Sequence, residues 1–183
     1  YNTEMLLTKE LYDLEHVPAE LRALFDVMYP WEILKKLDEF VAKIQDRRAG
    51  KIHPTAVIEG NVYMHESASI GPHAYIEGPL WMGVDAVIGH AAYVRGGVVL
   101  APNAKIGHST EVKRSLFLED AKAPHLNYVG DSVLGCKVNI GAGVKLANFN
   151  NMGTSIKIDG QATGLRKLGA MLGDEVTLGC NVA

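Results

Sequence analysis

The sequence predicts a mainly β protein, a parallel β-helix of six-residue repeats preceded by a small α-helical segment. The first observation is a period of six, because an aliphatic residue or methionine recurs at every sixth position from Ile52 onward. The second is that the residue four positions later is usually small, and that glycine often follows the aliphatic residue. Neither an α-helix nor an alternating strand has this period, whereas a β-helix with short flat faces does. Three hexads then make one triangular coil of about 18 residues, with the repeated side chains stacked inside.

The inward-facing series is expected to run unbroken over its first part. Its members are Ile52, Ile58, Met64, Ile70, Ile76, Met82, Ile88, Val94, Leu100, Ile106, Val112 and Leu118. The pattern resumes later at Leu134, Ile140, Leu146, Leu172 and Leu178. Two segments leave it, the one that contains His125 and the long one after Asn148. Long excursions from a compact repeat are more often functional than incidental, so both are candidate site regions.

Residues 1–50 are predicted to form the α-helical N-terminal segment, and residues 51–183 the β-helix domain. Within the first segment, Pro30 opens a helix, since proline is tolerated in a first turn. The apolar positions of that helix recur at helical spacing, at Leu34, Leu37, Val41 and Ile44. Gly50, which follows a basic pair, is the predicted stop. Because the chain ends at Ala183 within a repeat, we expect the β-helix to be truncated at its C-terminus.

Composition argues against several classes of protein. The net charge of −3 gives no strong attraction to nucleic acid. Two cysteines, Cys136 and Cys180, are too few for a disulfide framework or a four-ligand zinc site. No run of about 18 apolar residues predicts a membrane span, and the first residues do not resemble a signal peptide. A soluble, cytoplasmic protein is the expectation.

Two cations are predicted to stack on the outside of the coil. Arg95 and Lys113 each follow an inward aliphatic residue and lie one coil apart, about 4.8 Å in a β-helix. Stacked cations repel unless an anion lies near them. One interpretation is a solvated charge ladder, partly neutralised by Glu77 below them. The other, given equal weight, is a phosphate-binding site, because paired Arg and Lys suit phosphate oxygens.

A second outward column is apolar. Its members at the same spacing are Tyr63, Trp81, Val99 and Phe117. An exposed apolar stripe of this kind is usually covered. The N-terminal helices or another subunit could provide the cover, and packing is favoured over ligand stacking because aromatic stripes are more often packed than ligand-binding.

His125 interrupts the repeat between a proline and a leucine. A lone histidine is more often structural than catalytic. The polar residues that follow it in sequence, among them Tyr128, Asn139 and Asn148, favour the catalytic interpretation. A histidine can take a proton from an incoming nucleophile near neutral pH.

The segment SLFLEDAKAPHLNYVGDSVLGCKVNIGAGVKLANF (115–149) carries a more specific signal. It strongly resembles the acetyltransferase half of the bifunctional UDP-N-acetylglucosamine pyrophosphorylase/glucosamine-1-phosphate N-acetyltransferase family. The matching motifs are K-A-x-H-L-x-Y-x-G-D at 122–131, V-N-I-G-A-G at 138–143 and an asparagine at 148. Generic hexapeptide-repeat proteins share the aliphatic period but not this set of residues. The resemblance implies a left-handed parallel β-helix and an acetyl-CoA-dependent N-acetyltransferase.

The resemblance also implies roles for individual residues. His125 matches the general base that deprotonates the amino group of the sugar. Binding of the sugar phosphate falls to Arg95, Lys113, Tyr128, Asn139 and Asn148. Ala142 and Cys180 match positions that line the acetyl-CoA site, and the family has a serine where this chain has Cys180. The implied assembly is a homotrimer with sites between subunits, and no catalytic metal is expected.

The chain also departs from the family pattern. Phe149 replaces a tyrosine, and a longer segment replaces the lysine-bearing loop that follows. Lys157, Arg166 and Lys167 are candidates for the missing loop lysines. The nucleotidyltransferase half is absent from this sequence. Two hypotheses therefore stand beside the N-acetyltransferase of glucosamine-1-phosphate: an enzyme with another amino-sugar substrate or acyl donor, and a non-catalytic β-helix that trimerises or binds a sugar nucleotide.

Overall fold

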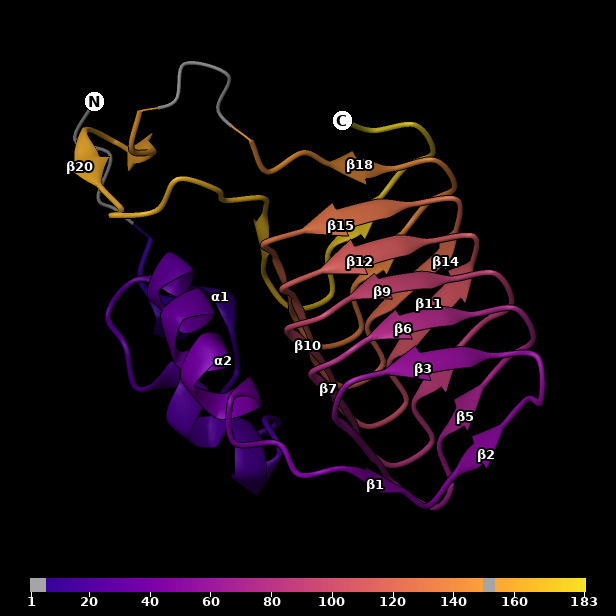
Figure 1. Ribbon diagram of the computed structural model, residues 1–183. Helices are drawn as coiled ribbons and strands as arrows, with labels where there is room; N and C mark the ends of the chain where they lie inside the picture. Colours follow the sequence, from indigo (N-terminus) through magenta and orange to yellow (C-terminus); the bar gives the residue numbers. More distant parts are fainter. Residues whose placement is uncertain (1–5, 150–153) are drawn as a thin grey trace.

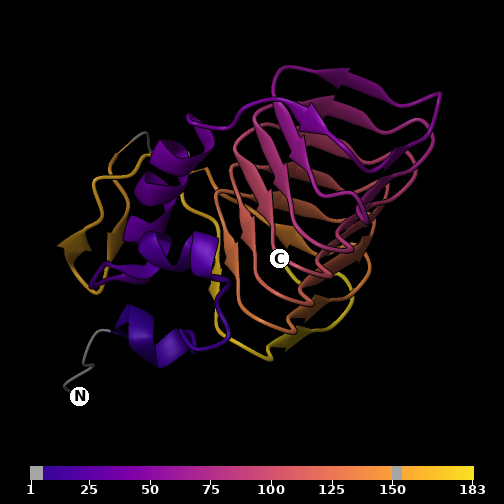
Figure 2. The ribbon, with the colours of Figure 1, turned by 90° about the horizontal axis from the view of Figure 1, so that it is seen from below.

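The computed structural model of the protein describes residues 6–149 and 154–183. Figure 1 shows short parallel strands stacked coil upon coil, with the N-terminal helices against one side. Figure 2 gives the same arrangement from below. The predicted fold class, a parallel β-helix preceded by a small helical segment, is confirmed.

Each coil contributes strands to three faces, which we name A, B and C. Face A contains, in spatial order, β1 (Arg47–Arg48), β4 (Val62–Met64), β7 (Leu80–Met82), β10 (Val98–Leu100), β13 (Leu116–Phe117), β16 (Val133–Leu134) and β21 (Met171–Leu172). Face B contains β2 (Lys51–Ile52), β5 (Ser69–Ile70), β8 (Val87–Ile88), β11 (Lys105–His108), β14 (Lys122–His125), β17 (Asn139–Ile140) and β22 (Thr177–Leu178). Face C contains β3 (Val57–Glu59), β6 (Tyr75–Glu77), β9 (Tyr93–Arg95), β12 (Glu111–Lys113), β15 (Tyr128–Gly130) and β18 (Lys145–Leu146).

The inward series fills the interior of the coils. Ile76, Met82, Ile106 and Val112 are each fully buried there. Burial of one such side chain contributes roughly 1.5–3 kcal/mol to stability. The aliphatic period therefore specifies the stack, because any shift of one position would turn these side chains to the outside.

The predicted series is wrong at its last member. Leu100 pairs with Phe117, so Phe117 points into the coil and Leu118 lies in the apolar cluster under the helices. The reason is a shorter corner between faces C and A. Two glycines, Gly96 and Gly97, join Arg95 to β10, whereas the next coil has one residue fewer at this corner. The coil length falls from 18 to 17 residues at this point, as the pairing of Val99 with Leu116 shows.

The helical segment is less helical than the sequence predicts. Its elements are α1 (Thr8–Leu11), the 3₁₀ helices η1 (Ala19–Phe25) and η2 (Pro30–Glu32), and α2 (Ile33–Val41). α2 ends at Val41, well before the predicted stop at Gly50. The chain has already joined face A before residue 51, since Arg47 pairs with Tyr63 of β4.

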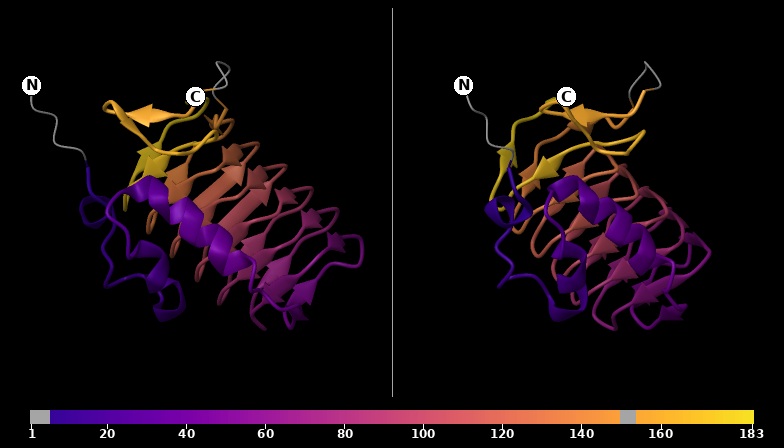
Figure 3. Two further views of the ribbon diagram at one scale, coloured as in Figure 1. Left: turned by 60° about the vertical axis from the view of Figure 1, so that its left-hand side comes forward. Right: turned by 90° about the vertical axis from the view of Figure 1, so that its left-hand side faces the viewer.

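The N-terminal helices cover face A, as both views of Figure 3 show. Leu34 and Leu37 of α2 belong to one buried cluster with Val99 and Leu116. Trp81 of the apolar column stacks on Tyr63, with ring centroids 5.7 Å apart, and meets Phe40 edge-on at 6.3 Å. The helices of the same chain therefore cover the apolar column. Its fourth member is Leu116, so the prediction of Phe117 is wrong for the reason just given.

The segment after Asn148 leaves the coil, as predicted, and rejoins face A at β21. It contains an antiparallel hairpin of β19 (Lys157–Ile158) and β20 (Gln161–Ala162). Its later part, with Leu165 and Leu168, packs against the apolar cluster under the helices. Within the described residues, no helix is long and apolar enough to cross a lipid bilayer.

Candidate active site

The segment around His125 does not leave the coil. β14 continues face B, with Lys105 opposite Lys122 and His108 opposite His125. The prediction of an excursion here is therefore wrong. The hexad count is lost because the preceding corner between faces C and A is one residue short, and the chain remains within the β-helix.

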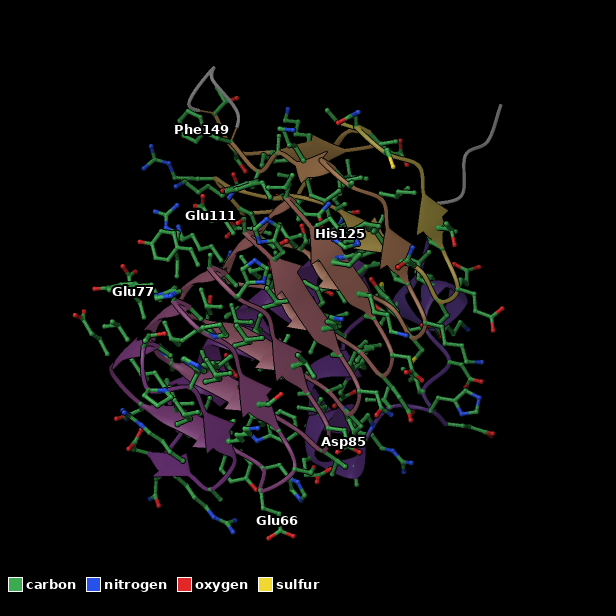
Figure 4. The ribbon with its side chains drawn as sticks, turned by 90° about the vertical axis from the view of Figure 1, so that its right-hand side faces the viewer. Glu66, Glu77, Asp85, Glu111, His125 and Phe149 are labelled. Atoms are coloured by element: carbon green, nitrogen blue, oxygen red, sulfur yellow. The ribbon has the colours of Figure 1, made fainter. Side chains whose placement is uncertain are left out.

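His125 lies in a column of residues at the corner between faces B and C. Figure 4 shows it on the upper part of face B. His108 lies opposite it on the coil below, and the ring of His108 stacks on that of His90 with centroids 4.1 Å apart. Backbone hydrogen bonds continue the column upward, because the carbonyl groups of His125 and Ala142 accept from the next coil at 3.0 and 2.8 Å. We call His90, His108, His125, Ala142 and Cys180 the histidine column.

The histidine column therefore contains the predicted base and both predicted coenzyme residues. The imidazole of His125 is exposed and has no hydrogen-bond partner among the described residues. The corner beneath it is fixed by Asn127, which is 3% exposed. Its Oδ1 accepts from the backbone N–H of His125 at 2.9 Å, and its Nδ2 donates to the carbonyl of Gly141 at 2.6 Å. These bonds fix the backbone of the corner, whereas the imidazole of His125 remains accessible to a ligand.

Asn139 lies on face B, away from the other predicted substrate residues. It begins β17 and pairs with Lys122 on one side and Thr177 on the other. Its side chain is exposed. Within the single chain it therefore lies on a different face from Arg95, Lys113 and Tyr128.

Tyr128 and Asn148 form a hydrogen-bonded pair. Tyr128 begins β15 on face C, and its hydroxyl donates to Oδ1 of Asn148 at 3.2 Å. Asn148 is 8% exposed, and its Nδ2 donates to a carboxylate oxygen of Asp131. Two predicted substrate residues are thus brought together, and one of them is anchored to a carboxylate that the sequence did not single out.

Gly130 leaves the space that this pair occupies. A Cβ atom at Gly130 would lie 2.6 Å from Nδ2 of Asn148 and 2.8 Å from the hydroxyl of Tyr128. Contacts below 3.0 Å are essentially absent between real Cβ atoms and their neighbours, so a larger residue would displace the pair. A side chain at the glycine of the Tyr-x-Gly-Asp sequence would therefore force Asn148 and Tyr128 to move.

A buried ion pair supports the carboxylate of Asp131. Asp131 is 1% exposed, and its Oδ1 accepts from Nη1 of Arg114 at 3.0 Å. The same guanidinium donates to both carboxylate oxygens of Asp38 on α2, at 2.7 and 2.9 Å. These bonds to Asp38 and Asp131 raise the pKa of Arg114 well above its usual value. Neither Arg114 nor Asp131 was predicted as a site residue, because they lie 17 residues apart and the predicted period of 18 does not place them in one column.

Lys113 borders a cationic groove at the corner between faces C and A. The groove has a volume of about 600 Å³, and its lining includes Lys113, Arg114, Asp131, Phe149, Arg166 and Lys167. Arg114 is paired, but no carboxylate lies within ion-pair distance of Lys113, Arg166 or Lys167 in the described part of the chain. Nζ of Lys167 lies 5.7 Å from the ring of Phe149, which is 60% exposed. Of the insert cations named as candidates, Arg166 and Lys167 line this groove.

Arg95 does not line the groove. It lies on the coil below Lys113, opposite Glu77, and its Nη1 donates to Glu111 at 2.8 Å. Its guanidinium also lies 5.9 Å from the ring of Tyr93. Tyr93 donates to Glu77 at 2.7 Å, a bond that raises the pKa of the tyrosine. Arg95 is therefore neutralised by Glu111 and not by the predicted Glu77.

The two cysteines differ in environment. Cys136 is buried, and burial raises the pKa of its thiol to about 11. Cys180 is exposed at the top of the histidine column. No cluster of three or more His, Cys, Asp or Glu residues suited to a metal ion occurs in residues 6–149 and 154–183.

Comparison with known proteins finds several relatives that match most of this chain. It is 52% identical over 161 residues to the bifunctional protein GlmU of Methanococcus maripaludis strain C7, a match that covers 86% of this chain and 39% of that protein. The bifunctional sugar-1-phosphate nucleotidylyltransferase/acetyltransferase of Sulfurisphaera tokodaii is 39% identical over 165 residues, with 86% and 40% covered. GlmU of Methanocaldococcus jannaschii is 39% identical over 161 residues, with the same shares covered as for Sulfurisphaera tokodaii.

These relatives confirm the resemblance found in the sequence. The chain spans about two fifths of the length of these curated relatives. A family model described as the GMPPB C-terminal domain matches residues 76–183, which is more than half of the chain. The chain thus belongs to the family of the GMPPB C-terminal domain and is a relative of the bifunctional GlmU proteins.

Proposed function

We propose that this chain catalyses acetyl-CoA-dependent N-acetylation of an amino-sugar phosphate such as glucosamine-1-phosphate. The observation that carries the proposal is the hydrogen-bonded pair of Tyr128 and Asn148, next to a groove that Lys113 lines. This arrangement offers polar groups for a sugar and unpaired cations for a phosphate. The Sulfurisphaera tokodaii relative is named as a nucleotidylyltransferase/acetyltransferase, in agreement with the proposal.

In the proposed reaction His125 is the general base. Its free imidazole removes a proton from the amino group of the sugar, because a protonated amine has no lone pair for attack. The nitrogen then forms a bond to the thioester carbonyl carbon of acetyl-CoA, and the carbon–sulfur bond breaks. The sulfur of coenzyme A takes up the second proton, which the nitrogen loses as the amide forms, and His125 releases the first proton to solvent. The products are the N-acetylated sugar phosphate and free coenzyme A.

The remaining residues bind the two substrates. Lys113, with Arg166 and Lys167 of the insert, supplies cations for the phosphate. Arg95, one coil below, could contribute to phosphate binding only by exchanging Glu111 for the phosphate. Tyr128, Asn148 and Asn139 hold the sugar. Ala142 and Cys180 line the acetyl-CoA site, because they lie above His125 on the histidine column.

We further propose that the complete site forms between copies of the chain in a homotrimer. Within one chain, the histidine column and the cationic groove lie at different corners of the coil. The imidazole of His125 does not reach hydrogen-bond distance of Tyr128 or Asn148. Leu126, directly after His125, is 57% exposed, as expected for a residue covered by a neighbouring subunit.

The proposal is tested by measuring thiol release from acetyl-CoA in the presence of glucosamine-1-phosphate. His125→Ala should lower turnover by about 10²–10⁴-fold, the usual contribution of a general base. His108→Ala is the matched control, because it removes an exposed histidine one coil below in the same column. Equal losses in both variants would contradict the assignment of His125. Light scattering that found a stable monomer at micromolar concentration would contradict the shared site.

The alternative is a non-catalytic module that trimerises or binds a sugar nucleotide. Two features favour this alternative. The segment after Asn148 departs from the family pattern, and the cationic groove could bind a phosphate group without catalysing a reaction. Absence of turnover with a panel of amino-sugar phosphates and acyl donors, together with saturable binding of a sugar nucleotide, would establish this alternative. Isothermal titration calorimetry with UDP-N-acetylglucosamine is the direct measurement.

A further inference from the structure

A continuous chain of polar contacts links helix α2 to the predicted substrate residues. It runs from Asp38 through Arg114 and Asp131 to Asn148, and ends at the hydroxyl of Tyr128. The helix lies outside the β-helix on face A, whereas Tyr128 lies on face C. We propose that Asp38 is a positioning residue, which sets the orientation of Asn148 and thereby the hydrogen-bonding role of Tyr128.

The first step is the orientation of Arg114. This residue forms a one-residue corner between faces C and A and has a left-handed backbone, with φ of 43°. Its guanidinium donates from Nε and Nη2 to the two oxygens of Asp38, at 2.9 and 2.7 Å. A bidentate pair of this kind fixes the plane of the guanidinium. Nη1 is then directed at Asp131, at 3.0 Å.

The second step is the use of both oxygens of Asp131. One accepts from Arg114 and the other from Nδ2 of Asn148. The side chain of Asp131 is 2% exposed, and Arg114 is the cation that pairs with it in the described residues. A buried carboxylate without a paired cation is strongly unfavourable, so the position of Asp131 depends on Arg114.

The third step fixes which end of the Asn148 amide faces Tyr128. If the amide were turned over, its Oδ1 would face the carboxylate of Asp131, and two acceptors would repel each other. Nδ2 therefore points to Asp131, and Oδ1 must accept the proton of the Tyr128 hydroxyl. With this proton engaged, the phenolic oxygen offers only lone pairs to a ligand. Tyr128 is thus suited to an N–H or O–H group of a ligand and not to a phosphate oxygen.

This inference rests on the proposed function only for the identity of the ligand. Its consequence is a division of roles: the cations of the groove bind the phosphate, and the oxygen of Tyr128 accepts from an amino or hydroxyl group of the sugar. Loss of Asp38 should weaken binding of the sugar and leave binding of acetyl-CoA unchanged. Helix α2, through Asp38, would thereby influence how the β-helix binds the sugar.

The test compares Asp38→Ala with the matched control Glu39→Gln, which changes the next, exposed acidic residue of α2. We expect the KM for glucosamine-1-phosphate to rise about tenfold in Asp38→Ala, the order expected for one weakened charge-assisted hydrogen bond. The KM for acetyl-CoA should not change, and Glu39→Gln should match the unmodified protein. In an Asn148→Ala background, the effect of Asp38→Ala should disappear. An effect of the same size in that background would overturn the proposal, because Asp38 would then act by some other route.

A second measurement does not depend on activity. The side-chain amide protons of Asn148, assigned by their loss in Asn148→Ala, can be followed by nitrogen-15 NMR. They should exchange with solvent about tenfold faster in Asp38→Ala than in Glu39→Gln, since the hydrogen bond to Asp131 protects them. Unchanged exchange would overturn the positioning role even if the protein proved not to be an acetyltransferase. Faster exchange without any turnover in the unmodified protein would instead contradict only the proposed function.

Discussion

The two corners that flank face C are built in different ways. At the corner between faces C and A, side chains hold one another, since Asp131 is bonded to Arg114 on one side and to Asn148 on the other. At the corner between faces B and C, hydrogen bonds hold the backbone, and the imidazole of His125 has no partner in the described residues. The first corner is preorganised within one chain. The second presents a reactive side chain that awaits a ligand or a neighbouring subunit.

The largest effect on stability should follow from breaking the first corner. Asp131→Ala removes a buried carboxylate that accepts from both Nη1 of Arg114 and Nδ2 of Asn148. Arg114 keeps its pair with Asp38, but each of the two donors left without this acceptor costs about 1–3 kcal/mol in the free energy of unfolding. Asp120→Ala is the matched control, because Asp120 also has a left-handed backbone at a corner but a side chain that is 40% exposed. Urea unfolding measures both. Similar losses in the two variants would show that backbone strain, and not the ion pair, is responsible.

A smaller loss of stability, together with loss of activity, should follow from filling the space beside Tyr128. Gly130→Ala places a methyl group within 2.6 Å of Asn148, and overpacking of this kind costs about 1–3 kcal/mol. Gly179→Ala is a control, since no atom lies within 4 Å of a Cβ atom at that position. Crystallography of Gly130→Ala should find the hydrogen bond between Tyr128 and Asn148 broken. An intact bond with normal substrate affinity would contradict the role of this pair.

Removal of the histidine at the second corner should leave stability nearly unchanged. His125→Ala deletes an exposed side chain without a partner, so the free energy of unfolding should shift by less than about 0.5 kcal/mol. Thermal unfolding of His125→Ala beside Asp131→Ala measures the contrast directly. A large loss in His125→Ala would show that the imidazole packs within the protein, for example at a subunit interface.

The smallest perturbation is chemical labelling of the cysteines. Cys180 is exposed on the histidine column and should react with iodoacetamide at pH 8. Cys136 should react far more slowly, because its pKa of about 11 keeps the thiol protonated and burial blocks access. Mass spectrometry of digested protein distinguishes the two sites. Acetyl-CoA should protect Cys180, and labelling of Cys180 at an unchanged rate would place the coenzyme elsewhere.

Much of the fold could be predicted because the β-helix repeats locally. A period of six in the sequence becomes a stack of buried side chains with a fixed register, so columns such as Arg95 above Glu77 follow from counting. The same count fails beyond the corner at Arg114, where one residue fewer moves Phe117 to the inside. A count cannot detect such a change, because both Phe117 and Leu118 are apolar and either could fill the interior.

The candidate site was predicted only in part. The family resemblance named Tyr128, Asn148, His125 and Ala142 one by one. The structure joins the first two as a hydrogen-bonded pair and places the other two in one column. The supporting ion pair was not predicted, since Arg114 and Asp38 are 76 residues apart in elements of different type. Nothing in the local sequence of α2 indicates which exposed acidic residue faces the β-helix.

The sequence by itself determined the stack of coils, the apolar column that needs cover, and the residue types available at each corner. These follow from periodicity, because burial of a repeated aliphatic residue leaves one register. Only the tertiary structure decided that the N-terminal helices provide the cover and that Asp38 meets Arg114. It also decided that the insert brings Arg166 and Lys167 to Lys113. The physical reason is that these contacts join the β-helix to the N-terminal helices and to the insert, which do not share its six-residue period. Where these segments lie on the β-helix depends on the packing of the whole apolar cluster under the helices.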